Sequence, residues 1–499
     1  MSFRKNVIAS YVGQIYVAVV GIAVLPLYMK TMGAEAYGLI GFFTMLQAWF
    51  ALLDLGLTPT ISRETARYRA GSMSAIEFRR LFRALSLIFL LIMLVGGGSL
   101  LLFAGAIASH WLKAESLDHG VVVGAVQIMA ICIALRWMGG LYRGVITGSE
   151  KLVGLSVFNI VVATLRFVGV FVSLFYYGFS AEVFFAHQLA IAVLEFLGLW
   201  LMTSRLLPVL GAADPAIGWS FACVQPLLKF ALSIAFTSSA WVLVTQSDKM
   251  ILSGVLPLAE YGHFSLAVLV ASGIMVLSGP VTNAVLPRLA RLHAEGKQLE
   301  MIALYRNATR LIALFIGSVS IVLAFCARPL LQAWTGDEAL AQSVAPILSL
   351  YAAGNGCLAL AAFPYYLQYA KGDLRYHLIG NIAIVCVLVP AILAAALTYG
   401  GIGAGYAWFL INLVFFLGWV TYVHYKIEPG IQWQWLVQDC LKIIVPVSLV
   451  VWVTSAWLVF SDNRLVMVLQ VLAIGVLALI VAGASAWPSL KGLLRKERA

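Results

Sequence analysis

The sequence predicts an all-α polytopic membrane protein with fourteen transmembrane helices, and three observations lead to this prediction. Of the 499 residues, 62% are hydrophobic and 11% are charged, whereas soluble proteins carry about 25% charged residues. The hydrophobic residues are collected into runs long enough to cross a bilayer, which takes about 20 residues. Positive charge gathers in the short segments between alternate runs, and this asymmetry sets the orientation of a membrane protein.

Apolar runs separated by charged or turn-forming segments define the predicted spans. We expect them at 7–29, 37–58, 84–110, 121–142, 153–178, 183–203, 230–254, 262–287, 311–332, 344–369, 378–399, 404–425, 443–460 and 465–487. Only a few residues separate spans 5 and 6, and likewise spans 11 and 12, so each of these pairs should form a helical hairpin. A twelve-span interpretation would require that the last pair does not cross the membrane.

The net charge of +11 comes from 32 Lys and Arg against 21 Asp and Glu. With the amino terminus in the cytoplasm, most of these cations fall in cytoplasmic segments, so both termini are predicted to be cytoplasmic. Nucleic-acid binding is not expected, because the cations are spread over short loops rather than clustered on one solvated face. The six cysteines are scattered without a C-x-x-C pair, so we expect no disulfide, no metal site and no cofactor.

Two short motifs recur at one offset along the chain. Tyr37-Gly38 returns as Tyr261-Gly262, and Ala66-Arg67 returns as Ala290-Arg291. The offset corresponds to six spans, which is an even number. The two halves are therefore expected to be parallel repeats related by an axis along the membrane normal.

The repeat and the charge pattern together predict the domain organisation. We expect a six-helix lobe at 1–204, a cytoplasmic linker at 205–228 and a second six-helix lobe at 229–426, with a central cavity between the lobes. Residues 427–499 would add two transmembrane helices and a basic carboxy-terminal tail. The connecting segments are too short to hold a soluble catalytic domain, so the function is expected to be carried out within the bilayer.

The first repeat carries three motifs in order: Gly33-x-Glu35-x-Tyr37-Gly38, Leu53-Asp54-Leu55-Gly56-Leu57 and Ser62-Arg63-Glu64-x-Ala66-Arg67. Together with the stretch 246–254 in span 7, they resemble the bacterial polysaccharide and O-antigen flippases of the multidrug/oligosaccharidyl-lipid/polysaccharide exporter superfamily. The resemblance implies translocation of an undecaprenyl-pyrophosphate-linked oligosaccharide across the inner membrane by alternating access. The partners would be this substrate and membrane lipid. Coupling to protons or sodium, and a polymerase partner, are left open.

Three cations lie within the predicted spans, where an ionisable group costs about 2.5–3.5 kcal/mol or more and is a candidate functional residue. Arg136, Arg166 and Lys249 are the candidate substrate-binding residues, because the implied substrate carries a pyrophosphate and an Arg fork can hold phosphate oxygens bidentately. For Arg136, the alternative is that the side chain extends to the inner headgroups.

Three carboxylates are candidates for coupling or gating. Glu195 lies near the centre of span 6, at a depth similar to that of Arg166 in span 5, so a direct ion pair is expected between them. This pair either fastens the two helices or holds Arg166 toward the substrate, with Glu195 carrying a coupling proton. Asp248 lies beside Lys249 in the polar span 7. Asp54, near the inner end of span 2, would cap or latch the inner gate or be a structural residue near the headgroups.

Three other functions compete with a lipid-linked oligosaccharide flippase. A multidrug or cation antiporter of the same superfamily should carry mainly acidic cavity residues. A peptidoglycan-precursor flippase of that superfamily is the second alternative. A membrane polymerase, ligase or acyltransferase would need a nucleophile and a base near the reacting sugar, and the short outer loops around 110–120 and 334–343 offer no convincing set. We therefore predict a transporter rather than an enzyme, without catalytic residues.

Overall fold

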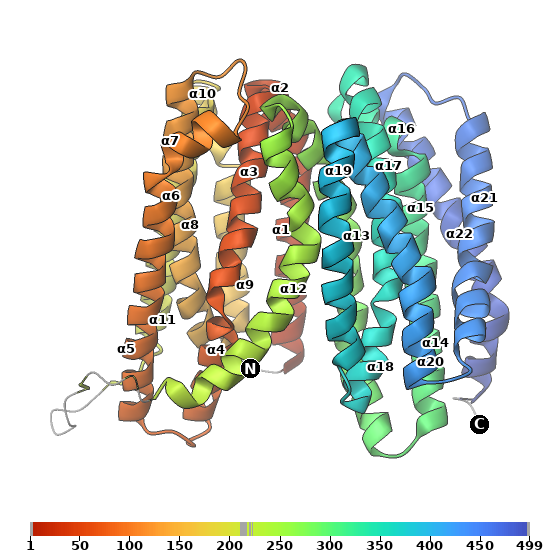
Figure 1. Ribbon diagram of the computed structural model, residues 1–499, viewed down its shortest axis with the longest axis horizontal. Helices are drawn as coiled ribbons and strands as arrows, with labels where there is room; N and C mark the ends of the chain where they lie inside the picture. Colours follow the sequence, from red (N-terminus) through yellow and green to blue (C-terminus); the bar gives the residue numbers. More distant parts are fainter. Residues whose placement is uncertain (1–2, 210–216, 219–220, 222, 497–499) are drawn as a thin grey trace. The chain divides into compact units, whose positions relative to one another are not determined.

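The computed structural model describes residues 3–209, 217–218, 221 and 223–496 and is built from helices (Figure 1). Within these residues no strand forms, and one isolated bridge joins Lys113 to Pro257. The all-α class predicted from the sequence is therefore confirmed. The chain divides into two compact units, Met1–Gly262 and His263–Ala499, which are described separately.

The first unit is a bundle of long apolar helices with short interruptions. Its helices are α1 (Phe3–Ala23), α2 (Leu25–Met32), α3 (Ala34–Phe50), α4 (Leu57–Arg69), α5 (Ala75–Ile92), α6 (Gly98–Leu102), α7 (Ala104–Ala106), α8 (His119–Gly148), α9 (Leu152–Phe167), α10 (Val170–Tyr177), α11 (Ala181–Ser204) and α12 (Gln225–Val255). A short 3₁₀ turn, η1 (Ala51–Asp54), joins α3 to α4.

Helix α8 is central to this unit, because it packs against α3, α4, α5, α9 and α11. Small residues bring α8 close to α4, which is how helices in a membrane gain packing contacts. A Cβ atom at Gly144 would lie 2.9 Å from the carbonyl oxygen of Thr58, and one at Gly140 would lie 2.9 Å from Oγ1 of Thr58. These two glycines are therefore required by the close approach of the helices.

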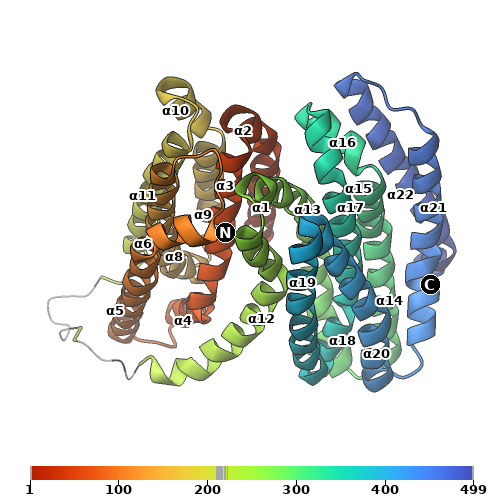
Figure 2. The same cartoon turned by 45° about the horizontal axis from the view of Figure 1, so that its top comes forward.

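The second unit is also a helical bundle (Figure 2). Its helices are α13 (Leu258–Ala294, whose first residues belong to the first unit), α14 (Gln298–Ile312), α15 (Ser318–Phe325), α16 (Ala327–Thr335), α17 (Glu338–Ala361), α18 (Phe363–Lys371), α19 (Arg375–Val414), α20 (Val420–Ile427), α21 (Lys442–Trp457) and α22 (Arg464–Lys496). The last two helices lie side by side in both views and pack against α15.

Twelve helical segments of the described chain are long and apolar enough to cross a membrane. One of them, Arg375–Ile427, corresponds to predicted spans 11 and 12 and is interrupted at Gly400, whose φ of 59° and ψ of −143° are not helical. Helix α12 has 31 residues, corresponds to predicted span 7 and is not among the twelve. A multi-pass membrane architecture is confirmed, whereas the total of fourteen spans and the placement of the termini stay predictions.

Parts of the predicted domain organisation lie outside the described residues. In the predicted linker these are residues 210–216, 219–220 and 222, and in the predicted basic tail they are residues 497–499 together with the side chains from 487 onward. Helix α12, which we predicted to open the second lobe, packs against α3 and α4 within the first compact unit. The division into two six-helix repeats around a cavity stays a prediction.

Candidate functional site

A cluster of three arginines surrounds one carboxylate inside the first unit. Glu195 on α11 accepts a hydrogen bond at Oε1 from Nη2 of Arg143 at 2.5 Å, and it accepts another at Oε2 from Nη2 of Arg166. The Nε atom of Arg136 lies 3.8 Å from the same Oε2 atom. The Glu195 side chain is 8% exposed, and those of Arg136 and Arg166 are 12% and 19% exposed. The predicted Arg166–Glu195 contact is present, as part of a larger cluster.

Neutral side chains accept hydrogen bonds from three further guanidinium nitrogens of Arg136 and Arg143. Arg136 donates from Nη1 to Oε1 of Gln47 at 2.7 Å and from Nη2 to Oε1 of Gln188 at 3.0 Å. Arg143 donates from Nη1 to Oδ1 of Asn159 at 2.6 Å. The Arg136 side chain is thus held inside the bundle, and the alternative in which it extends to the headgroups is wrong for this structure.

The cluster is assembled by one spacing that occurs on three helices. Residues seven apart lie about two turns apart on the same helical face. Helix α8 places Arg136 and Arg143 in this way, α9 places Asn159 and Arg166, and α11 places Gln188 and Glu195. Because α8 packs against both α9 and α11, the three polar pairs meet in one region of the bundle.

The charges in this cluster do not balance. Three guanidinium groups face the single carboxylate of Glu195, so the cluster carries an excess of positive charge. Charged groups within a membrane protein are normally paired, because an unpaired charge is costly in a medium of low dielectric constant. The arrangement can therefore accept an anionic group, and planar guanidinium groups are well suited to phosphate oxygens.

A cavity of about 420 Å³ lies beside the cluster and is lined by residues of η1, α4, α8 and α12. Among its lining residues are Asp54, Thr58, Arg136, Ser238 and Ser239. Two predicted site residues, Arg136 and Asp54, therefore line the same cavity. Ser238 and Ser239 of the polar span 7 also line it, which fits the tendency of polar faces on membrane helices to meet other helices or cavities rather than lipid.

Asp54 caps a helix in this structure. Its carboxylate accepts hydrogen bonds from the Thr58 backbone N–H, at 3.2 and 3.3 Å, and from Oγ1 of Thr58 at 2.5 Å. The chain then passes through Leu55 and Gly56, which have φ of 46° and 72° and form the left-handed turn before α4. This contact with the first turn of α4 was not among the roles predicted for Asp54. A role in gating stays a prediction.

Asp248 and Lys249 lie next to each other on α12 and contact one another. Lys249 donates from Nζ to the Thr245 carbonyl oxygen at 2.7 Å, and its Nζ lies 3.4 Å from Oδ1 of Asp248. Asp248 is 1% exposed. These two residues form a local pair on α12. Their predicted roles in substrate binding and gating have not been tested.

Sequence reasoning missed four members of the cluster: Arg143, Gln47, Asn159 and Gln188. Arg143 lies one residue beyond predicted span 4, which ends at 142, so it was not considered as a residue within a span; in the structure α8 continues to Gly148, and Arg143 reaches Glu195. The three amides are uncharged and do not stand out in a scan for ionisable groups. Arg143, Asn159 and Gln188 each lie seven residues from a predicted site residue on the same helix, whereas Gln47 lies on α3 outside this spacing, and only the packing of the helices brings the four together. Within the described part of the chain, no three His, Cys, Asp or Glu side chains come together as a metal site requires.

Comparisons of the sequence with known proteins find a polysaccharide biosynthesis family and a protein named for O-antigen transport. The family model of polysaccharide biosynthesis proteins matches residues 3–293. A Shigella flexneri protein whose name assigns it O-antigen transport is 21% identical over 413 residues, which cover 82% of this chain and 94% of that protein.

Solved structures share the fold. The lipid II flippase MurJ, in an inward closed conformation, matches with a TM-score of 0.74 at 16% identity, covering 97% of this chain and 99% of that one. An inward-facing multidrug resistance transporter of the MATE family and MOP superfamily matches with a TM-score of 0.64 at 12% identity, covering 82% and 94%. At these identities the similarity establishes a common fold.

Proposed function

We propose that this chain, which belongs to the polysaccharide biosynthesis protein family, is a flippase that moves an undecaprenyl-pyrophosphate-linked oligosaccharide across the bacterial inner membrane. The cargo would be a repeat unit of O-antigen or of another surface polysaccharide. Membership of the family and similarity to a protein named for O-antigen transport support a membrane transporter rather than an enzyme.

The observation that carries the proposal is the charge of the arginine cluster. Arg136, Arg143 and Arg166 outnumber the carboxylate of Glu195 by two. A pyrophosphate linked at both ends carries one ionised oxygen on each phosphate, so its charge would match this excess. Placing such an anion beside three arginines would offset the cost of bringing pyrophosphate into a medium of low dielectric constant.

Each residue of the cluster would have a role in transport that follows from its position. Arg136 lines the cavity and would make the first contact with the pyrophosphate. Arg166 and Arg143, which Glu195 binds in this structure, would turn to the substrate as it enters. Glu195 would then keep the arginines oriented when the site is empty, and it is the group that a coupling proton would reach. Alternating access would carry the bound anion from one side of the membrane to the other.

The charge of the cluster argues against one of two competing functions and is compatible with the other. A multidrug antiporter that takes cations requires acidic groups in its cavity, and here the cluster is cationic. A peptidoglycan-precursor flippase would use the same pyrophosphate contacts, and the fold shared with the lipid II flippase keeps this candidate in view. These two flippase functions differ in the sugar, which the assay below varies.

The test is a flipping assay with purified protein in proteoliposomes. A fluorescent undecaprenyl-pyrophosphate-linked disaccharide is placed in the outer leaflet, and its disappearance from the reach of a membrane-impermeant quencher is followed. Loss of one charge-assisted contact costs about 1.5–3 kcal/mol, so Arg136→Ala and Arg166→Ala should each slow flipping by about tenfold or more.

The matched control is Arg375→Ala, which removes an arginine that pairs with Asp373 in the second unit and should leave flipping unchanged. Flipping of a peptidoglycan-type disaccharide but not of an O-antigen-type one would assign the competing cargo. Wild-type rates in both cluster variants would overturn the proposed site.

A further inference from the structure

Span 5 is interrupted between the end of α9 at Phe167 and the start of α10 at Val170, close to Arg166. In a continuous helix the N–H groups of residues 169 and 171 would bond to the carbonyl groups of residues 165 and 167. Here the N–H of Gly169 bonds to the Thr164 carbonyl at 2.9 Å, and the N–H of Phe171 bonds to the Val168 carbonyl at 3.1 Å. The helix therefore leaves carbonyl groups without their usual partners at the centre of a membrane span.

Side chains from two other helices bond to three consecutive carbonyl groups at this break. Leu165 O accepts from Nε2 of His187 at 3.0 Å, Arg166 O accepts from Nε2 of Gln188 at 3.2 Å, and Phe167 O accepts from the Tyr28 hydroxyl at 2.6 Å. Because a carbonyl can only accept, Nε2 of His187 carries a proton. Interrupted spans are tolerated in a membrane when neighbouring groups bond to the freed carbonyls.

A glycine makes the break sterically possible. A Cβ atom at Gly169 would lie 2.5 Å from Leu165 O and 3.0 Å from Leu165 Cα. Such a distance is well inside van der Waals contact, so any larger residue would push the two sides of the break apart. The conformation of the break therefore depends on Gly169 as well as on the three side chains that bond to its carbonyl groups.

Gln188 links this break to the arginine cluster. Its Nε2 atom donates to the Arg166 carbonyl at 3.2 Å, and this fixes which end of the amide faces the break. The Oε1 atom then faces Arg136 and accepts from its Nη2 at 3.0 Å. The Gln188 side chain is almost fully buried. One amide thus connects the backbone at Arg166 to the guanidinium group of Arg136.

We propose that the break between α9 and α10 is a positioning device and that Gln188 is a positioning residue of the anion site, setting Arg166 and Arg136 at a fixed separation for the two phosphates of the substrate. This inference rests on the function proposed above. Tyr28 and His187 support the same geometry by holding the carbonyl groups on either side of Arg166.

A purely structural role for these side chains predicts a different result from a positioning role. If Gln188 only satisfies a carbonyl, its loss should lower the melting temperature and leave anion affinity unchanged. If Gln188 positions the arginines, the affinity for the anion should fall by more than it falls in a control variant that loses a similar amount of stability. The experiment therefore measures binding and stability separately on the full-length protein.

The probe is inorganic pyrophosphate, titrated by calorimetry into purified protein in nanodiscs, with melting temperatures recorded without ligand. Gln188→Leu should weaken pyrophosphate binding by about tenfold, because the arrangement of two charged donors is lost. Tyr28→Phe, which removes one hydroxyl and touches neither guanidinium, should weaken binding by about threefold. This second variant keeps the proposal testable if Gln188→Leu does not fold.

The matched control is Gln368→Leu in the second unit. Gln368 is as buried as Gln188 and bonds to backbone groups at both ends, the Pro364 carbonyl and the His377 N–H, but neither contact involves an arginine. Its variant should lose stability and keep wild-type affinity.

The two proposals fail in different ways. If wild-type protein does not bind pyrophosphate, or if Arg136→Ala and Arg166→Ala bind it normally, the anion site is wrong and the positioning role falls with it. If those arginine variants lose binding while Gln188→Leu and Tyr28→Phe keep wild-type affinity, the anion site stands and the positioning role is overturned.

Discussion

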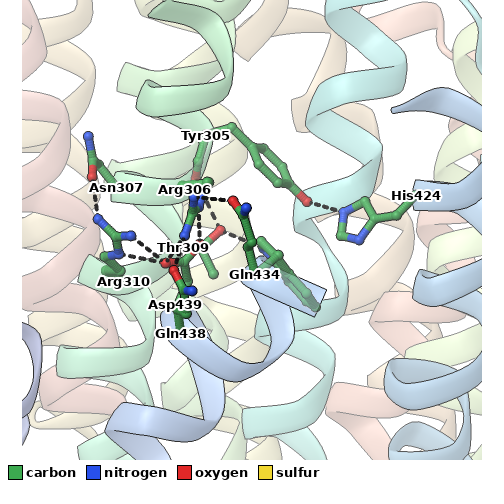
Figure 3. A network of polar contacts seen from close by, with 10 residues as sticks. Tyr305, Arg306, Asn307, Thr309, Arg310, His424, Gln434, Gln438 and Asp439 are labelled. Carbon is green, nitrogen blue, oxygen red and sulfur yellow. Dashed lines mark hydrogen bonds and ion pairs between the residues drawn. The ribbon is translucent and has the colours of Figure 1, made fainter. Parts of the chain in front are cut away.

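Arg306 donates from Nε to Oδ2 of Asp439 at 2.6 Å, and the Asp439 side chain is fully buried. Arg306 lies on α14 and Asp439 on the π-helical segment η6 (Gln434–Leu441), which leads into α21. Arg310 donates to the same carboxylate from Nε at 2.6 Å, as Figure 3 shows. The carboxylate thus fastens the carboxy-terminal helix pair to the rest of the second unit.

Removal of this carboxylate should destabilise the second unit. Asp439→Asn keeps the shape of the side chain but leaves Arg306 and Arg310 without a counter-charge in a buried position. Breaking a buried ion pair by removing one partner costs about 3–5 kcal/mol. We expect a large fall in the melting temperature of the purified protein, measured by static light scattering or by nanoscale fluorimetry.

The control for Asp439→Asn is Asp373→Asn, which breaks the pair with Arg375 at an exposed position. Exposed ion pairs contribute little, since water and salt screen them, so this variant should melt like the wild type. Equal melting temperatures for Asp439→Asn and the wild type would show that the amides of Gln434 and Gln438, which also accept from Arg306, hold the segment without the carboxylate.

Composition predicted the helical membrane architecture because long apolar runs have few alternatives in a bilayer. The positions of the charged residues predicted the Arg166–Glu195 contact, since two mid-span charges on a helical hairpin gain by pairing. The break after Arg166 left no comparable signal. It contains no proline, and Gly169 is one of 43 glycines in the chain. The amides that complete the site are neutral, so their positions emerge only when α8, α9 and α11 are packed together.

The Arg166–Glu195 contact gives a prediction that an isolated ion pair would not give. In an isolated pair, exchanging the two residues restores stability. In this structure, Arg143 and Arg136 also depend on Glu195, so an arginine at position 195 would face two further arginines. We expect the double variant Arg166→Glu with Glu195→Arg to be no more stable than the less stable single variant, a loss of about 3 kcal/mol or more.

Thermal unfolding of the two single variants and the double variant forms a double-mutant cycle that checks this expectation. Recovery of the double variant to within about 0.5 kcal/mol of the wild type would mean that the contact acts as an independent pair. A second cycle that uses Arg143→Gln in place of the exchange measures how strongly the third arginine is coupled to the same carboxylate.

Hydrogen bonds to the Glu35 carboxylate hold the loop at residues 115–117, so we expect this loop to resist proteolysis. Its carboxylate accepts from the backbone N–H groups of Glu115 at 2.9 Å, Ser116 at 2.8 Å and Leu117 at 2.9 Å. Removing it should leave three partly buried N–H donors without this carboxylate and loosen the loop. We expect Glu35→Ala to be cut faster by trypsin after Lys113, by about tenfold, with the rate followed by mass spectrometry of the fragments.

Glu115→Gln is the control for the Glu35 variant, because the Glu115 side chain is exposed and only its backbone N–H takes part in the arrangement. It should be cut at the wild-type rate. If Glu35→Ala is also cut at the wild-type rate, the loop is held by other contacts, such as the bond from Nζ of Lys113 to the Val255 carbonyl.

Asp54 tests whether a helix cap inside the candidate site also works in transport. Its carboxylate caps α4 through Thr58 and lines the cavity that Arg136 also lines. Loss of a capping side chain costs about 1 kcal/mol, whereas Asn caps nearly as well as Asp. We therefore expect Asp54→Ala to be less stable by about that amount and Asp54→Asn to melt close to the wild type. If capping is the whole role, Asp54→Asn should also flip the lipid-linked disaccharide at the wild-type rate. A slow Asp54→Asn variant of normal stability would instead show that the negative charge beside Arg136 takes part in transport, because the substitution removes that charge and keeps the cap.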